Sequence, residues 1–302
     1  TQSEDAYLKA IEINPKRGSY RWRLANFYLR TQEIRKAMPH FEAAIQLNPV
    51  EYLQPTLSLL WKTGTSVQSI SKIWPQGKEA RLILMRFLAR TERDEPLLLS
   101  KEWSKLIEST NPPTVAEGEF YLRYLLNRDR PQESRRGWIR LAEKNSLHDE
   151  DYSSGKNLIW NGRFQMSITA RLFDWDISIK EEVARTGLDD GLKMEFLGTQ
   201  NIDLYGLTQL VVVKPGAKFE FSFRARSEGL STDQGPYLEI EPIELKGIMT
   251  DQGPDVRIVP SSVLLESKQL LGTTDWREYS GVFRIPRDRD LVRIRLRRHP
   301  SN

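Results

Sequence analysis

"KFEFSFRARS", residues 218–227, alternates apolar and polar side chains without interruption. Phe219, Phe221 and Phe223 fall on one face of an extended chain, and charged or polar residues fill the positions between them. A period of two residues is typical of a β-strand with one buried and one exposed face. The stretch therefore predicts a strand of an antiparallel sheet whose aromatic face points into a core.

The same period recurs elsewhere in the second half of the chain. "YLEIEPI" (237–243) separates Leu238 and Ile240 from polar neighbours, and "LVRIRLRR" (291–298) alternates aliphatic residues with arginines. Clusters of Gly, Pro and Asp lie between such segments, where turns form. Several short alternating strands within about 150 residues predict an antiparallel β-sandwich.

A polar segment precedes these strands and sets the expected domain boundary. "SLHDEDYSSGK" (146–156) contains few apolar residues and interrupts a helical pattern that fills the first half. We therefore expect a helical repeat domain over residues 1–150 and a sandwich of the jelly-roll type over residues 151–302.

The helical half opens with a repeat. "AYLKAIEINP" (6–15) returns as "HFEAAIQLNP" (40–49), so that the second Asn-Pro pair follows the first after 34 residues. This is the length of a tetratricopeptide repeat, which folds as helix-turn-helix. Pro49 is expected to end the second helix of the unit, and Pro39 predicts a kink or a late helix start.

Beyond Pro49 the period is lost, but helical patterning continues to the boundary. A stack of short antiparallel helices can offer a docking groove for a protein or peptide, or it can be a structural spacer. Both interpretations are open from the sequence. The expected helices lie in "VEYLQPTLSLLWKTG", "SVQSISKIW", "EARLILMRFLART", "PLLLSKEWSKLIES", "PTVAEGEFYLRYLLNRD" and "RPQESRRGWIRLAEKN".

Composition narrows the function classes. Hydrophobic residues make up 39% and charged residues 28% of the 302 residues, as in globular proteins. A net charge of +4, without basic and aromatic residues interleaved, does not favour nucleic acid. There is no cysteine, and the three histidines are widely separated, so we expect no metal site.

The N-terminus suggests a fragment. The chain begins with Thr1 rather than Met, inside a repeat unit, and no run of eighteen apolar residues occurs. We therefore expect any signal peptide or membrane anchor to lie in missing flanking segments.

Three segments of the second half resemble jelly-roll carbohydrate-binding modules. "NLIWNGRF" (157–164) resembles their opening strand, "GLTQLVVVKPGAKFEFSFRARS" (206–227) their central hairpin, and "DWREYSGVFRIP" (275–286) a late strand containing Trp. Together with tetratricopeptide-like helices, such a sandwich resembles bacterial cell-envelope proteins of polysaccharide assembly or export. The resemblance implies glycan binding and favours a periplasmic or cell-envelope location.

The resemblance also implies a structural calcium ion, but the chain departs from the pattern that holds it. The family usually has Glu after the Phe of the first strand, and this chain has Gln165. The family's acidic closing strand does not follow "RRHPSN" either. We expect no cofactor, with a structural calcium left open.

Sugar recognition needs an aromatic ring that stacks on a pyranose and planar polar groups that bind its hydroxyls. In the family resembled, the concave sheet face binds glycan, and the strand position of Gln209 often contributes. The residues that we expect to bind a glycan are Gln209, Arg224, Arg226, Tyr237 and Glu239, with Trp175 or Tyr205 as the stacking ring.

A structural interpretation competes with this site. Trp160 and Trp276 are expected in the core, and the two arginines can instead form cross-strand ion pairs. Their acidic partners would be Glu220, Glu239 and Glu241. The arginines that alternate in residues 291–298 have two interpretations as well, a site for an acidic polysaccharide or the charged protection of an edge strand.

Glu239 and Glu241 also raise the question of catalysis, because two carboxylates on one strand face could form a glycosidase pair. Such pairs normally come from different strands that face each other across the sugar, so we expect no enzyme. The sequence favours a non-catalytic protein that binds a poly- or oligosaccharide through its sandwich and a protein partner through its helices. The alternatives are a protein–protein scaffold whose sandwich binds no sugar and, more weakly, a glycan-processing enzyme.

Overall fold

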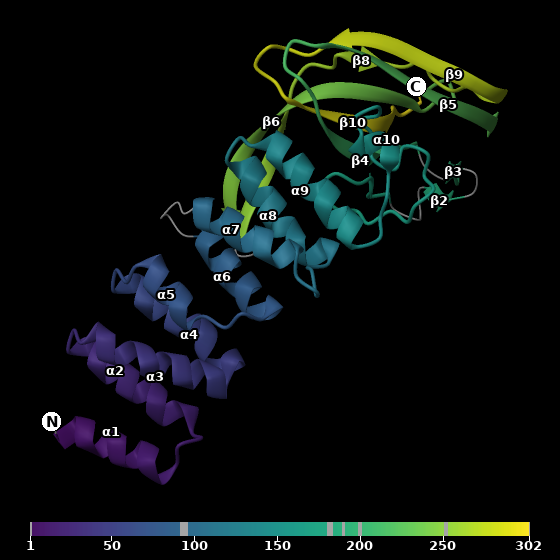
Figure 1. The fold of residues 1–302 in the computed structure, drawn as a ribbon. Helices are drawn as coiled ribbons and strands as arrows, with labels where there is room; N and C mark the ends of the chain where they lie inside the picture. Colours follow the sequence, from purple (N-terminus) through teal and green to yellow (C-terminus); the bar gives the residue numbers. More distant parts are fainter. Residues whose placement is uncertain are drawn as a thin grey trace. The chain divides into compact units, whose positions relative to one another are not determined.

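The computed structural model describes residues 2–90, 96–179, 184–188, 191–198, 201–250 and 253–301. Helices fill the first part of the chain and antiparallel strands the second, as the sequence predicts (Figure 1). The chain divides into two compact units, Thr1–Pro112 and Pro113–Asn302. Among the described residues, none of the helices combines the length and the apolar character that crossing a bilayer requires.

The first unit is helical. Every helix expected after Pro49 in this unit forms, and the assignment to tetratricopeptide repeats stays a prediction. The helices of the unit are α1 (Gln2–Ile13), α2 (Gly18–Arg30), α3 (Ile34–Leu47), α4 (Pro49–Lys62), α5 (Val67–Ile73), α6 (Lys78–Arg90) and α7 (Pro96–Ile107).

Helices α2 and α3 pack closely because small residues lie at their contact. Ala25 and Ala44 have no exposed surface, so the two backbones can approach. Pro39 lies inside α3, which begins at Ile34; the expectation of a late helix start is therefore wrong. Pro49 follows the end of α3, as predicted, and it is also the first residue of α4, a position where a missing N–H costs nothing.

The second unit begins with helices, not with the sandwich. α8 (Val115–Asn127) contacts strands β6 (Tyr237–Thr250) and β7 (Gly253–Pro260), and α9 (Pro131–Lys144) contacts strand β4 (Leu204–Val212). The short α10 (Glu150–Ser153) follows. The change from helix to strand thus occurs near the expected position 150, whereas the compact units divide at Pro112. α8 and α9 were expected to stack on other helices; they pack on each other, and both also contact strands.

Polar contacts fix α8 on the strands. Arg123 of α8 lies 2.7 Å from a carboxylate oxygen of Asp255 on β7, and the amide of Asn127 donates to the Asp255 carbonyl at 3.1 Å. A side chain on Gly247 of β6 would collide with Asn127. The absence of a side chain at this position therefore permits the close approach of helix and strand.

The main sheet is antiparallel and has the order β1-β4-β10-β6-β7, with β8 also paired to β6. β10 is a central strand, so the interpretation of its arginines as protection of an edge is wrong. The strands are β1 (Asp176–Ile177), β4 (Leu204–Val212), β6 (Tyr237–Thr250), β7 (Gly253–Pro260), β8 (Leu265–Glu266) and β10 (Leu291–Arg298).

A second layer consists of β5 (Lys218–Leu230) and β9 (Gly272–Arg284), which pair only with each other among the described strands. We call this pair the β5–β9 ribbon. The central hairpin expected over residues 206–227 does not form, because β4 pairs within the main sheet and β5 pairs with β9. The turn at Pro215-Gly216 therefore carries the chain from one layer to the other. A small separate hairpin contains β2 (Ala184–Leu188) and β3 (Leu192–Phe196).

The opening strand expected over residues 157–164 does not form either. Asn161 and Phe164 have φ angles of 49° and 54°, a left-handed conformation that an extended strand does not allow. Asn157 also accepts a hydrogen bond from the backbone of Ile159 two residues on, at 3.0 Å. The segment is therefore a series of turns, stabilised by local asparagine contacts.

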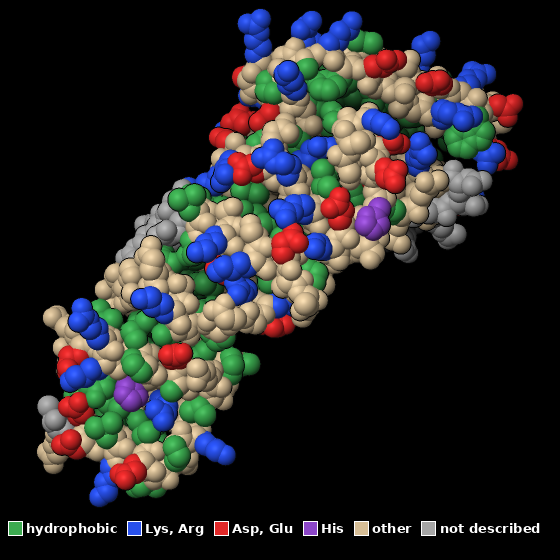
Figure 2. Space-filling view, in the orientation of Figure 1, with side chains coloured by type: hydrophobic (Ala, Val, Ile, Leu, Met, Phe, Trp, Pro, Cys, Tyr) green, Lys and Arg blue, Asp and Glu red, His purple; other side chains and the backbone are tan. Residues whose placement is uncertain are grey.

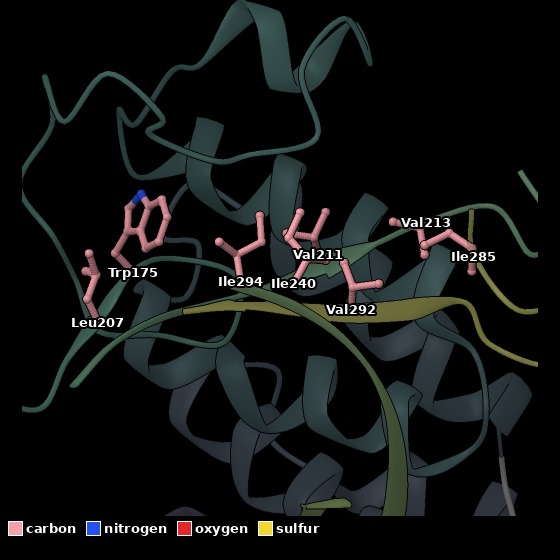
Figure 3. Packing of buried hydrophobic residues seen from close by; sticks show 8 residues of the cluster. All are labelled: Trp175, Leu207, Val211, Val213, Ile240, Ile285, Val292 and Ile294. Carbon is pink, nitrogen blue, oxygen red and sulfur yellow. The ribbon is translucent and has the colours of Figure 1, made fainter. Parts of the chain in front are cut away.

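The core of the sandwich lies on one face of the main sheet (Figure 3). Phe219, Phe221 and Phe283 of the β5–β9 ribbon pack against this cluster, so the aromatic face of β5 points inward as its alternation predicts. We call this side of each layer its inner face. The cluster contains Trp175, Leu207, Val211, Val213, Ile240, Ile285, Val292 and Ile294.

The division of the chain makes a prediction about fragments. Trp138 of α9 is fully buried, and its ring lies 5.3 Å from that of Trp160 and 6.3 Å from that of Phe173. Loss of such a buried aromatic residue alone costs about 3–5 kcal/mol. We expect fragment 113–302 to unfold in one cooperative transition in urea, and fragment 151–302, which lacks α8 and α9, to show none. Equal unfolding free energies of the two fragments would contradict this division.

Candidate functional site

Gln209, expected to bind a glycan, has a structural contact instead. Only 2% of its surface is exposed. Its side-chain amide donates to the backbone carbonyl of Trp160 at 2.8 Å and accepts from the Trp160 N–H at 3.1 Å. The side chain thus pairs with the turns of residues 157–164 as a neighbouring strand would, and both its amide N–H and its amide oxygen are hydrogen-bonded.

Trp175 is also buried. It has 5% exposure, belongs to the inner core cluster, and donates its indole N–H to the Asn161 carbonyl at 3.3 Å. A ring in this position cannot stack on a sugar in the present conformation. Trp160, expected in the core, is buried as predicted.

Glu239 and Glu241 lie on the outer face of the main sheet with 3% and 1% exposure. Register places Arg295 of β10 opposite Glu239 and Arg293 opposite Glu241, and each opposed pair forms an ion pair. Burial of these carboxylates is tolerated because each has a charged partner. The alternating arginines of β10 therefore neutralise buried carboxylates, and this pair of glutamates is not accessible to a substrate.

Tyr237 and Tyr205 lie near one end of the same strands. Tyr237 is 4% exposed, and its hydroxyl lies 2.9 Å from Nε2 of His299. Burial, followed by the charge of Glu239, raises the pKa of the Tyr237 hydroxyl. Tyr205 is 54% exposed, but the guanidinium of Arg297 lies over its ring at 4.7 Å from the centroid. Of the residues expected on the main sheet, Tyr205 alone offers an exposed ring.

Arg224 and Arg226 lie on a different surface. They alternate with the inward-facing phenylalanines of β5, so both point away from the core and are exposed. Within the described parts of the chain, neither guanidinium takes part in an ion pair or a hydrogen bond. The cross-strand ion pairs considered from the sequence are therefore absent for these arginines.

Trp276 of β9 lies between them in space. Its ring centroid is 5.7 Å from the guanidinium carbon of Arg224 and 5.4 Å from that of Arg226, within the range of cation–π attraction. The indole is 47% exposed, so the expectation that Trp276 is a core residue is wrong. We call Arg224, Arg226 and Trp276 the Trp–Arg surface.

The local pairing of the strands explains this arrangement. Arg224 lies opposite Glu278, and the register shifts between Ala225 and Ser227, where β9 contains an additional residue. The shift lies next to Trp276, and bulges of this kind redirect side chains at sheet edges. Among the described residues, no contact of Glu278 with Arg224 is within ion-pair distance, so its carboxylate stays available as an acceptor.

The sequence contained a signal for Trp276. In "GTTDWREYSGVFR" (272–284), Trp276 has the same parity as Glu278 and Ser280, which are polar, and not that of Tyr279 and Phe283. Counting by twos therefore places the indole on the exposed face.

Figure 2 shows Lys and Arg side chains along the surface over β5 and β9, with Asp and Glu among them. The chemistry that the Trp–Arg surface offers is a flat apolar ring beside two unneutralised guanidinium groups. A ring of this kind stacks on apolar ring faces, and each guanidinium donates several hydrogen bonds in one plane.

A cleft between the two layers of the second unit has a volume of about 2130 Å³. The strands line it with apolar side chains of their inner faces, among them Val211, Phe221, Phe223, Ile240 and Ile294. Polar side chains line it as well, and Arg224, Arg226 and Trp276 are among the lining residues. The Trp–Arg surface therefore borders this cleft.

A structural calcium does not fit the described residues. No group of three or more Asp, Glu, His or Cys side chains among them could hold a metal ion. The buried carboxylate of Asp174 accepts from the N–H and hydroxyl of Thr169 at 2.6 and 2.7 Å and from the N–H of Trp175 at 2.8 Å. Burial raises the pKa of Asp174, and its oxygens are used within the protein.

Comparison with known proteins gives weak likenesses only. No family model and no curated protein matches the chain. A solved structure described as "CBM4 structure and function" has a TM-score of 0.29 and 17% identity, over 48% of this chain and 90% of that one.

A second likeness is the N-terminal xylanase 10B of Clostridium thermocellum, with its CBM22-1 and GH10 modules and bound xylohexaose. Its TM-score is 0.23 at 10% identity, over 39% of this chain and 21% of that one. Both TM-scores are below 0.5, so these structures do not fix a function or a binding site for this chain.

The contrast between Gln209 and Trp276 predicts different effects on stability. Gln209→Ala leaves a buried N–H and a buried carbonyl of Trp160 without partners, which costs about 1–3 kcal/mol for each group. We expect the free energy of unfolding to fall by about 2–5 kcal/mol in urea titrations. Trp276→Ala removes an exposed ring and should change it by less than about 1 kcal/mol. A larger loss for Trp276→Ala than for Gln209→Ala would show that their roles are reversed.

Proposed function

We propose that this protein is a non-catalytic glycan-binding protein and that the Trp–Arg surface is its binding site. The observation that carries the proposal is the exposed indole of Trp276, 47% accessible, beside two arginines without acidic partners. Burial of a side chain this large is normally favourable. We infer that a ligand covers this exposed Trp, which lies on a largely polar strand face with Val282 as a further exposed apolar residue.

The surroundings of Trp276 complete the requirements of a sugar site. Ser222 and Ser280 lie opposite each other on the outer face of the ribbon and are exposed, as is Glu278. Hydroxyl and carboxylate oxygens accept hydrogen bonds from sugar hydroxyls, and the guanidinium groups donate to sugar oxygens. One sheet face thus offers a stacking ring, donors and acceptors.

The proposal that binding is non-catalytic rests on the carboxylates. The pair that could have acted in glycoside hydrolysis, Glu239 and Glu241, is buried and neutralised by Arg295 and Arg293. On the ribbon, Glu220 and Glu278 are on the outer face of two neighbouring strands, and both are solvated. A general acid uses a carboxyl group in a desolvated environment, and both of these carboxylates are exposed.

A role in envelope polysaccharide assembly or export is part of the same proposal. It is supported by the sequence resemblance of the second half and by the stacked helices of the first unit. These helices are proposed to hold a protein partner, because exposed apolar residues, Leu8, Ile13, Leu47 and Val50, lie on α1, α3 and α4. A scaffold whose sandwich binds no sugar is the alternative that the experiment below tests.

A glycan array probed with the whole chain tests the proposed function. Trp276→Ala should weaken binding of any captured glycan about five- to thirty-fold, since a stacked aromatic anchor contributes about 1–2 kcal/mol. Tyr205→Ala is the matched control, because it removes an exposed ring, 54% accessible, from the main sheet. It should leave affinity within two-fold.

Binding that depends on Tyr205 and not on Trp276 would move the site to the main sheet. No binding across neutral and acidic glycans would contradict the proposed function and favour the scaffold.

A further inference from the structure

We propose that the Trp–Arg surface selects glycans that carry an acidic group, with the carboxylate of a uronic acid as the group that Arg224 and Arg226 bind. This inference rests on the proposed function and adds the chemical class of the ligand. It starts from the electrostatics of the β5–β9 ribbon rather than from its aromatic residue.

The first observation is that the two guanidinium charges are not neutralised. Several described arginines of the second unit have carboxylate partners, for example Arg293 with Glu241 and Arg297 with Asp203 at 2.7 Å. Arg224 and Arg226 have none, although Glu278 lies directly opposite Arg224 in the register. An unpaired cation next to an available carboxylate leaves its donors free for an external anion.

The second observation is the local excess of positive charge. Among the exposed side chains of residues 218–228 and 275–284, which include the neighbours of Trp276, there are five cations and four carboxylates. The cations are Lys218, Arg224, Arg226, Arg277 and Arg284, and the carboxylates are Glu220, Glu228, Asp275 and Glu278. A surface of this sign attracts acidic ligands and repels other cations.

The third observation is the geometry of the pair. Arg224 and Arg226 are two residues apart on one strand face, roughly 7 Å along the strand, and both lie against the same indole. A planar guanidinium matches a carboxylate with two parallel hydrogen bonds, which an ammonium group cannot do. A uronic acid that stacks its ring on Trp276 would bring its carboxylate within reach of either arginine. A neutral sugar would leave both charges without a partner.

The test compares an oligomer of galacturonic acid with its methyl ester, which keeps the sugar ring and removes the charge, by calorimetric titration of the whole chain. We expect the acid to bind at least ten-fold more tightly than the ester. Arg224→Gln and Arg226→Gln should each weaken binding of the acid about ten-fold and change binding of the ester less than two-fold. Affinity for the acid alone should fall with added salt.

Three variants serve as controls. Arg224→Lys keeps the charge without the planar fork, and its affinity for the acid should lie between those of the wild type and Arg224→Gln. Lys218→Gln removes a cation from the same face, six residues or about 20 Å along the strand, and should leave affinity unchanged. Trp276→Ala should weaken acid and ester alike, which separates stacking from charge. A sulfated and a phosphorylated oligosaccharide, tested in parallel, show whether the arginines require a carboxylate.

The outcomes separate this inference from the proposed function. Equal affinity for acid and ester, unaffected by both arginine substitutions, overturns the acidic preference while the glycan site stands. If a neutral glycan binds and the charged oligosaccharides do not, the acidic preference is likewise overturned and the glycan site stands. Failure of every neutral and acidic glycan overturns both proposals together.

Discussion

The period-two geometry of β5 is the constraint on which the rest of the second unit depends. Phe219 and Phe221 pack against the core cluster and are half-buried, and the backbone then places every intervening residue on the opposite face. Arg224 and Arg226 are exposed for this reason. A shift of one residue would expose the aromatic residues and bury two cations, at a cost that no partner in the core could offset.

Two sets of polar contacts stabilise the main sheet against which the ribbon packs. The Gln209 amide joins the turn segment at Trp160 to the centre of the main sheet, in place of a strand that does not form. On the outer face of the main sheet, ion pairs between β10 and β6 neutralise the buried Glu239 and Glu241. Several residues that were expected to bind a ligand therefore make contacts within the protein, and the surface that is available for recognition lies on the ribbon.

The fold class could be predicted from the sequence because it depends on local periodicity. The alternation in β5, β6 and β10 and the apolar stripes of the helices each require only a short segment. The partners of β5, the turns at residues 157–164 and the assignment of α8 and α9 to the second unit depend on long-range pairing, which no short segment encodes. The site shows the same division. The exposure of Arg224 and Arg226 could be predicted from the alternation of β5. Gln209, Tyr237 and Glu239 have suitable side chains for sugar binding, but only the tertiary contacts reveal that their polar atoms already have partners.

A crystal structure of the whole chain with a bound acidic oligosaccharide tests the central claim most directly, because it locates the sugar without reference to any substitution. The account predicts a pyranose ring against the indole on β9, with its acidic group within hydrogen-bond distance of a guanidinium from β5. A sugar that contacts only the inner-face side chains between the layers, or that lies against Tyr205 on the main sheet, would contradict it.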